Sequence, residues 1–442
     1  MVNQPLDTQL KARREILKAV ATSAACVALL EAVPAAGAAF LAQNTESSQD
    51  SADQPVRVTW ARDFPQSQID AVKQSGSGIS GPGRPIRSGF DLGQADSAKG
   101  HVKVTAENRE SLASGSVVKQ GFLPDIQPVW DLHIRDTQII LGPDNHYYMT
   151  GSTGNDIWEY NDGIELYRSR DLHHWTYMGL VWSIERDGGW EKQWRIKNGR
   201  PIRSVWAPEI HYVRGNYYIC FAMPPGGISI LKSSTGRPQG PYEHATNRNR
   251  PLLGGMGPVE TSDLIDPTLF EDEDSRVYFS YGAAREIARM KDDLSGFAEP
   301  LRGVSLLSPD HNPAHHHPIC IPKLGLNDIG FEGATIFKRN GNYYLGSTDI
   351  YDGRYTMMLA ISDHVYGPYR MRHATIACNG GTGFFKAKDG YWYTSIFGDD
   401  AQAPWREKPG ILRVEFSTEG RVQLAPEQPS FLLRRGNVDR FR

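Results

Sequence analysis

Three acidic residues, Asp136, Asp266 and Glu332, fall at similar places in a repeated pattern of this 442-residue sequence. Each stands ahead of a short apolar run, a polar turn and a pair of aromatic residues. Asp136 and Glu332 precede their aromatic pairs by eleven residues, and Asp266 precedes its pair by twelve, across a longer turn. Carboxyl groups that meet in one pocket cannot all ionise freely, so their pKa values separate into acid and base roles. The spacing therefore predicts acid–base chemistry by three carboxylates, provided that the fold brings them together.

The pattern that carries these acids occurs five times along the chain. Each copy reads as a β-hairpin, because β-forming residues flank a turn rich in Asn, Asp or Gly. The hairpins are expected at residues 139–148, 210–218, 268–279, 335–344 and 384–393. Intervals of tens of residues leave room for four strands per unit, and repetition on that scale is typical of propellers. We therefore predict an all-β fold, a five-bladed β-propeller catalytic domain, over residues 124–442.

A propeller would place the acids together. The innermost strand of every blade begins near the central axis, so equivalent positions at those starts converge on one pocket. The second copy has Trp206–Glu209 at this point, and the fifth has Gly380–Gly383. A single acid there would usually be a solvated loop residue or a turn cap. Three in nearly the same register favour a catalytic pocket.

Four short motifs at these positions resemble the landmarks of the family 43 glycoside hydrolases: Arg135–Ile139, Trp206–Glu209, Ile265–Phe270 and Phe331–Ala334. The resemblance covers residues 130–422 and implies a glycosidase on a five-bladed propeller. It further implies inversion on plant or algal oligo- or polysaccharides, with arabinofuranosyl or xylosyl units favoured. Inversion needs two carboxyl groups about 6.5–9.5 Å apart, which leaves room for a water molecule.

The same resemblance implies a role for each acid. Asp136 matches the general base that activates water, and Glu332 matches the general acid that protonates the departing oxygen. Asp266 matches the third carboxylate, which orients Glu332 and adjusts its pKa. Trp158 and Trp206 are our candidates for stacking on a sugar ring, although a role in the core is equally open for both.

The sequence departs from the family pattern in the fifth copy. Many members carry a histidine there that holds a water molecule or a calcium ion, whereas the matching stretch here is Gly380–Phe384. Thr137 also stands where the family usually has proline.

His315, His316 and His317 lack the i, i+4 spacing of helical zinc sites and are interpreted as a solvated loop. A related propeller family that acts on agar-derived oligosaccharides does use a histidine as its acid. We expect no metal and no other cofactor, because the missing histidine argues against calcium.

Two other functions remain open. One is a glycosidase of a neighbouring propeller family that acts on another sugar, such as a galactofuranose or anhydrogalactose unit. The other is a non-catalytic propeller that binds sugars, although a binder has no need for three acids. A retaining sucrose-type enzyme is disfavoured, because the Asn-Asp-Pro-Asn motif of that group does not occur.

The N-terminus predicts export. Arg13 and Arg14 precede an Ala-rich apolar run over residues 19–30, and Ala35–Ala39 offers a small-residue cleavage site. The paired arginines resemble a twin-arginine signal, with an ordinary secretory signal as the alternative. The apolar run is too short to span a bilayer. Residues 1–39 are therefore predicted to be an export signal, and the mature protein is predicted to be periplasmic or extracellular without membrane insertion.

The composition and charge of the sequence limit the structure and the partners that can be expected for the rest of the chain. Residues 40–123 are rich in Ser, Gly, Gln and Asp and predict an irregular, linker-like extension, with a short strand or helix possible at Ser67–Lys73. A net charge of −3 without basic blocks argues against nucleic acid as a partner, which leaves an oligo- or polysaccharide substrate. Beyond the export signal three cysteines remain, without metal-ligand spacing, and Cys220 is predicted to be a buried thiol.

Overall fold

The structure is a computed structural model, and its described residues are 66–75, 128–130, 133–153, 159–197, 200–224, 226–254, 264–307, 328–351, 354–397, 408–433 and 437–439. The chain divides into two compact units, residues 1–55 and 56–442, and everything described here belongs to the second. The predicted export signal, Trp158 and the three adjacent histidines lie outside the described residues.

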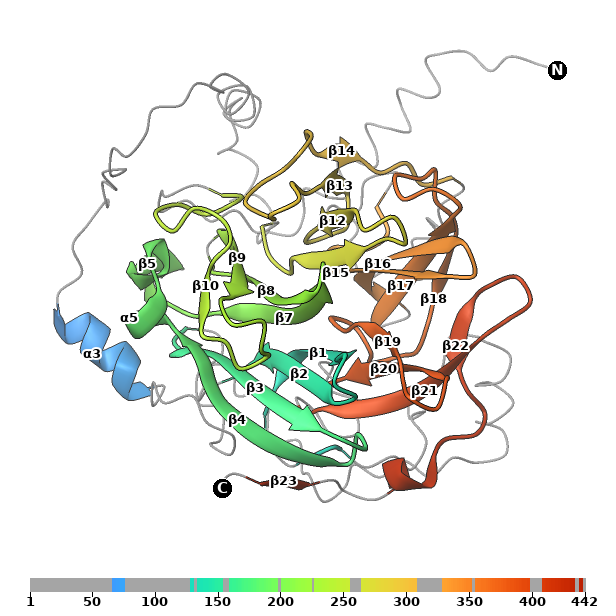
Figure 1. Ribbon diagram of the computed structural model, residues 1–442, viewed down its shortest axis with the longest axis horizontal. Coiled ribbons are helices and arrows are strands. Elements are labelled where there is room, and N and C mark those ends of the chain that lie inside the picture. The colour runs from blue at the N-terminus through green and yellow to red at the C-terminus, as the bar shows by residue number, and fades with distance from the viewer. Residues whose placement is uncertain are drawn as a thin grey trace, which may run out of the picture. The chain divides into compact units, whose positions relative to one another are not determined.

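Nearly all of the described chain is β-structure, arranged as five antiparallel sheets that form a five-bladed propeller (Figure 1). The prediction of an all-β propeller is confirmed. The strands of blade 1 are β1 (Arg135–Leu141), β2 (Tyr147–Ser152), β3 (Gly163–Ser169) and β4 (His174–Ser183). Those of blade 2 are β7 (Trp206–Val213), β8 (Asn216–Ala222), β9 (Ile228–Ser233) and β10 (Tyr242–His244).

The remaining blades repeat the same meander of four strands. Blade 3 contains β11 (Thr268–Glu271), β12 (Val277–Ser280), β13 (Glu286–Arg289) and β14 (Arg302–Gly303). Blade 4 contains β15 (Glu332–Arg339), β16 (Asn342–Tyr351), β17 (Arg354–Ser362) and β18 (Arg370–Ala374). Blade 5 contains β19 (Phe384–Lys386), β20 (Trp392–Ile396), β21 (Gly410–Phe416) and β22 (Val422–Leu424).

The other elements are short. Between blades 1 and 2 lie α5 (Ile184–Asp187), the 3₁₀ turn η2 (Trp190–Lys192) and a two-stranded ribbon of β5 (Arg195–Lys197) and β6 (Arg200–Ile202). A second 3₁₀ turn, η5 (Ser430–Leu433), precedes β23 (Asn437–Asp439), which pairs in parallel with β4 and adds a fifth strand to blade 1. The segment Ser67–Lys73 lies within a helix, α3 (Gln66–Ser75). No helix among the described residues is long and apolar enough to cross a membrane.

All five hairpins predicted from the sequence form the inner two strands of their blades. Two of them have two-residue turns with positive φ at both positions: Arg214–Gly215 (50° and 75°) and Asn340–Gly341 (50° and 79°). That geometry matches the right-handed twist of paired strands, so these turns fix the register. In blades 2 and 4 the turn therefore fixes how the two inner strands are paired.

The repeated aromatic pairs form the core between neighbouring blades. Ring pairs join blades 1 and 2, 3 and 4, 4 and 5, and 5 and 1, with centroid separations of 5.1–6.2 Å: Tyr148–Tyr217, Phe270–Tyr343, Phe337–Phe384 and Tyr147–Phe385. Such contacts add roughly 0.5–1.5 kcal/mol each beyond the burial of apolar area. They hold the inner strands in a fixed ring, in which β1 contacts both β7 and β19, and β11 contacts both β7 and β15.

Candidate active site

A pocket lies where the inner strands begin, and all three predicted acids line it. Asp136 comes from the first strand of blade 1, Asp266 lies two residues before that of blade 3, and Glu332 opens that of blade 4. Trp206 lines the same pocket from blade 2, as expected of a residue that could contact a sugar. The other lining residues are Arg135, Ser152, Ile265 and Tyr355. Residues far apart in the sequence thus converge at the ends of four different strands.

A repeated backbone irregularity positions the pocket. In every blade one residue at the entrance of the inner strand has a positive φ: Asp136 (51°), Ala207 (44°), Asp266 (49°), Gly333 (72°) and Gly381 (66°). In blades 1, 2 and 4 the strand register also shifts there, which marks a β-bulge. A left-handed conformation costs a non-glycine residue about 1–2 kcal/mol. The surrounding structure therefore has to hold Asp136 and Asp266 in place.

The strand pairing corrects one part of the sequence argument. Glu332 pairs with Thr348, as Arg135 pairs with Ser152, so Glu332 is equivalent to Arg135 and not to Asp136. The equal count of eleven residues arose because the hairpin of blade 4 is one residue shorter, which offsets the difference in register. The acids still meet, but the aspartates stand at the bulge itself and Glu332 stands one residue ahead of it.

Side-chain oxygens on one blade hold the bulge of the next. The Ser152 hydroxyl accepts a hydrogen bond from the backbone N–H of Ala207 at 2.8 Å and donates one to Asp136 Oδ2 at 2.7 Å. Asp266 Oδ2 accepts from the Gly333 N–H at 2.8 Å. Thr348 Oγ1 accepts from the Gly381 N–H at 2.7 Å. Asp136 and Asp266 therefore take part in the hydrogen bonds that fix the bulges.

Glu332 is held by a phenol. The Tyr355 hydroxyl donates to Glu332 Oε1 at 2.7 Å, and its ring lies edge-on to Phe397 at a centroid distance of 6.2 Å. The Glu332 backbone carbonyl accepts from the Ser347 hydroxyl at 2.8 Å. Both the carboxyl group and the backbone of this acid are therefore fixed by neighbouring strands of its own blade.

Asp266 has an altered acidity. Burial raises the pKa of this carboxyl well above its usual value, and the negative charges of Asp136 and Glu332 raise it further. The hydrogen bond from Gly333 acts in the opposite direction, and Glu209 adds a smaller upward effect. Carboxyl groups that share a pocket disfavour one another's ionised forms, which is the reason that Asp136 and Glu332 act on Asp266 in this direction.

Four lining residues were missed by the sequence argument. Arg135 was quoted only as part of a motif, yet it is buried, and its guanidinium lies 4.8 Å from the centre of the Phe397 ring. Ser152 could have been found as the cross-strand partner of Arg135 once the hairpin register was known. Ile265, like Arg135, was quoted only as part of a motif, whereas Tyr355 belongs to the third strand of its blade and carried no recognisable signal.

The glycines of the fifth blade leave no room for a histidine. A Cβ added to Gly380 would lie 2.4 Å from Thr348, and one on Gly383 would lie 1.9 Å from Gln138 Oε1. A Cβ on Gly381 would lie 3.0 Å from the Phe397 ring. The described residues at this point therefore do not fit a calcium ion held by a histidine.

The chain belongs to the glycosyl hydrolases of family 43, whose family description matches residues 126–422. The prediction of a glycosidase is confirmed at the level of the family. A β-D-galactofuranosidase of Aspergillus niger is 28% identical over 221 residues, which cover 47% of this chain and 54% of that protein. A xylosidase/arabinosidase of Bacteroides ovatus is 21% identical over 335 residues, 66% of this chain and 92% of that protein.

The chain spans about half the length of two curated relatives, 54% of the Aspergillus protein and 49% of a Xylanibacter ruminicola protein that is 26% identical. Among solved structures, a family 43 β-xylosidase/α-arabinofuranosidase from a compost microbial metagenome, in complex with xylotriose and free of calcium, has a similar fold. It gives a TM-score of 0.50 at 18% identity, over 68% of this chain and 98% of that one. At that identity the likeness shows the fold alone.

Proposed function

We propose that this protein hydrolyses O-glycosidic bonds of plant or algal oligo- and polysaccharides by inversion, with arabinofuranosyl or xylosyl units as the favoured sugars. One observation carries the proposal: Asp136, Asp266 and Glu332 line a single pocket together with Trp206. The names of the matched relatives, which include xylosidases and arabinosidases, support the choice of sugars. The Asp-rich pocket suits the positive charge that develops on the sugar ring in the transition state.

In this mechanism Asp136 is the general base. The hydrogen bond from Ser152 to Oδ2 favours the ionised carboxylate, which is the form that accepts a proton from water. The Ser152 hydroxyl is itself oriented by the Ala207 N–H, so the carboxylate of Asp136 is held through blade 2. The water then attacks the anomeric carbon from the face opposite the departing group.

Glu332 is the general acid. The Tyr355 hydroxyl bonds to Oε1, which directs the acid proton to Oε2 and fixes the carboxyl plane. That proton passes to the glycosidic oxygen as its bond to the anomeric carbon breaks, so the departing group leaves as an alcohol while the anomeric carbon takes the hydroxyl group from water. Trp206 provides an aromatic surface for the sugar beside these groups.

Asp266 is the orienting carboxyl. Its bond to the Gly333 N–H fixes the residue that follows Glu332, so it acts on the acid through the backbone as well as through charge. Burial and the nearby carboxylates of Asp136 and Glu332 raise the pKa of Asp266, because adjacent negative charges disfavour its ionised form.

A panel of aryl glycosides tests the proposal: an α-L-arabinofuranoside, a β-D-xyloside and a β-D-galactofuranoside, each with wild type and Glu332→Ala. We expect cleavage by wild type of one of the first two, a loss of about 10²–10⁴-fold in the variant, and a smaller loss with better leaving groups. Equal losses for all leaving groups would remove Glu332 from the role of acid. Cleavage of none by wild type would favour a sugar outside this panel or a binding-only propeller, and binding to polysaccharides would then be measured.

A second sugar is favoured by one specific observation. The relative from Aspergillus niger is named a β-D-galactofuranosidase, so a galactofuranosyl unit is the alternative substrate. Preference of the wild type for the β-D-galactofuranoside, measured as kcat/KM, would replace the pentose assignment while leaving the three catalytic roles in place.

Export is proposed from the N-terminal residues alone. The pair Arg13 and Arg14, the apolar run and Ala35–Ala39 support cleavage near residue 39 and a periplasmic or extracellular mature protein. N-terminal sequencing of the protein recovered outside the cytoplasm is expected to begin just after this stretch. Accumulation of the uncleaved chain in the cytoplasm would overturn the assignment, and Arg13→Lys with Arg14→Lys tests the twin-arginine route.

A further inference from the structure

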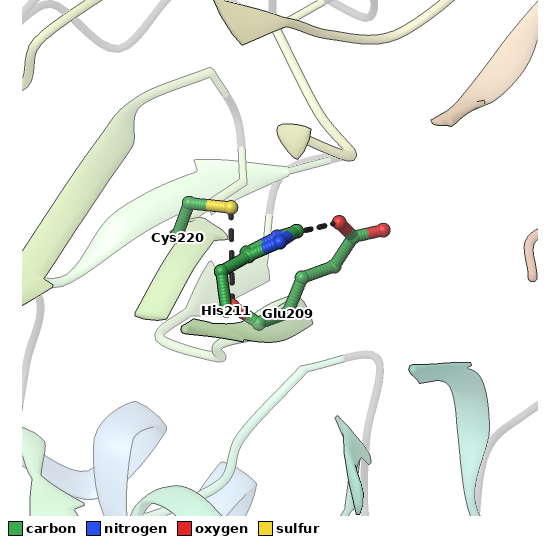
Figure 2. Close-up of side chains that lie close together, drawn as sticks. All are labelled: Glu209, His211 and Cys220. Carbon is green, nitrogen blue, oxygen red and sulfur yellow. Dashed lines mark hydrogen bonds and ion pairs between the residues drawn. The ribbon is translucent and has the colours of Figure 1, made fainter. Parts of the chain in front are cut away.

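Three side chains of different chemistry face one another on the inner hairpin of blade 2, as Figure 2 shows for Glu209, His211 and Cys220. Glu209 and His211 are two residues apart on β7, so their side chains lie on the same face of the sheet. Cys220 on β8 is the direct cross-strand partner of Glu209. An oxygen, a nitrogen and a sulfur atom thus lie within 4.8 Å of one another.

The group is enclosed and partly hydrogen-bonded. His211 Nε2 lies 3.0 Å from Glu209 Oε2, and the two side chains are only 9% and 13% exposed. Cys220 is fully buried, and its thiol donates to the backbone carbonyl of Pro267 at 3.0 Å. Pro267 directly follows Asp266, so this carbonyl places an oxygen atom from the segment ahead of β11 next to the sulfur of Cys220.

This donor set matches one class of ion. Zinc takes thiolate, imidazole and carboxylate ligands in a four-coordinate, tetrahedral arrangement. Calcium and magnesium require sets of oxygen ligands and do not select a thiol. Binding a divalent ion would release the thiol proton of Cys220 to solvent and leave a sulfur–metal bond, with His211 bound as neutral imidazole.

We propose that Glu209, His211 and Cys220 bind one Zn²⁺ ion, with the Pro267 carbonyl oxygen in reach as the fourth ligand. The three side chains of this site are not among those that line the catalytic pocket. The bound ion would join β7 and β8 of blade 2 to the segment that carries Asp266. The proposal does not depend on the hydrolytic activity, and its test reads metal binding directly.

The test uses the full chain, stripped with a chelator, dialysed and titrated with zinc or with cobalt as a spectroscopic probe. We expect one equivalent of zinc per chain, a thiolate-to-cobalt charge-transfer band and a higher melting temperature with zinc. Cys220→Ser should abolish the band and weaken zinc binding about 100-fold or more, since even outer partners of metal ligands contribute 10–100-fold. Cys378→Ser is the matched control, because Cys378 is the other buried cysteine of the described residues that forms no disulfide, and it should behave as wild type.

His211→Gln provides a second variant if Cys220→Ser fails to fold, and it should weaken zinc binding to a similar extent. Several results would overturn the proposal: no charge-transfer band, no zinc-dependent shift in melting temperature, or zinc bound equally by wild type and both ligand variants. The group would then be a buried thiol beside a hydrogen-bonded histidine–glutamate pair.

Discussion

Blades 1 and 2 have the same backbone at the pocket and different side chains on it. In both, the inner strand begins with a residue paired to the second strand, Arg135 with Ser152 and Trp206 with Ala222. A bulge residue with positive φ follows, Asp136 at 51° in blade 1 and Ala207 at 44° in blade 2. Only blade 1 carries a carboxylate there. The bulge is therefore a feature of the propeller, and the chemistry depends on which residue occupies it.

The largest expected effect comes from making blade 1 resemble blade 2. Asp136→Ala removes the base while keeping a residue that blade 2 already tolerates in this conformation, so we expect kcat to fall about 10³–10⁴-fold with little change in melting temperature. Steady-state kinetics and thermal melts measure the two quantities. Retention of a tenth or more of the wild-type kcat would exclude Asp136 as the base.

The substitution Asp266→Asn extends the comparison to blade 3, where the residue with positive φ is again an aspartate. We expect kcat to fall about 10²-fold, because the carboxyl that orients Glu332 is lost. Since the folded-state pKa of Asp266 is raised above its unfolded value, the native state binds this proton more tightly. Its contribution to stability is present at low pH and is lost as pH rises from about 4 through the raised pKa.

Denaturant unfolding between about pH 4 and pH 8 measures this difference. The Asp266→Asn variant should not show the loss of stability with rising pH that Asp266 causes. It should therefore be more stable than wild type above the raised pKa of Asp266. Parallel stability curves for the two proteins over the whole range would contradict the assigned pKa shift.

Two substitutions, one at the bulge of blade 5 and one at the bulge of blade 2, test whether the bulge of blade 5 holds Asp136 in place. A Cβ on Gly381 would lie 3.1 Å from Asp136 Oδ1 and 3.0 Å from the Phe397 ring, at a φ of 66°. Gly381→Ala should therefore displace the base, lowering kcat about tenfold and destabilising the fold by about 1–2 kcal/mol. Ala207→Gly is the control and should change kcat by less than about twofold. Equal effects of the two would show that the bulge of blade 5 does not position Asp136.

The smallest effect is expected at Tyr355. Tyr355→Phe removes the hydrogen bond to Glu332 Oε1, so we expect about a tenfold lower kcat on substrates with poor leaving groups and less on activated aryl glycosides. Loss of a donor favours the protonated carboxyl, so the alkaline limb of the pH–rate profile should move to higher pH. A uniform decrease for all leaving groups, without movement of that limb, would indicate a purely structural role.

The hairpins and the three acids could be predicted because they rest on local chemistry. Asn-Gly and Arg-Gly turns, β-forming flanks and aromatic pairs repeat within short windows, and the propeller follows from their number. The meeting of Asp136, Asp266 and Glu332 needed only the assumption that inner strands begin near one axis. The site prediction therefore depended on the repeat and not on any long-range contact.

The partners of the acids could not be predicted, for physical reasons. Ser152 acts through cross-strand register, and Tyr355 reaches Glu332 from the third strand of its blade, so neither is close in sequence to its partner. The bulge could not be predicted either. Asp136, Ala207 and Asp266 adopt a positive φ, and the residue types at these positions do not require it. Counting residues consequently aligned Glu332 with Asp136, although strand pairing aligns it with Arg135.

The stereochemistry of hydrolysis tests the central claim most directly. Proton NMR of a β-D-xyloside or α-L-arabinofuranoside, whichever the wild type cleaves, identifies the anomer that forms before mutarotation. With Asp136 activating water and Glu332 protonating the departing oxygen, the first product should have the inverted configuration, α-D-xylose or β-L-arabinose. A first product of retained configuration would contradict the account, because one of the carboxylates would then have to form a covalent bond to the sugar.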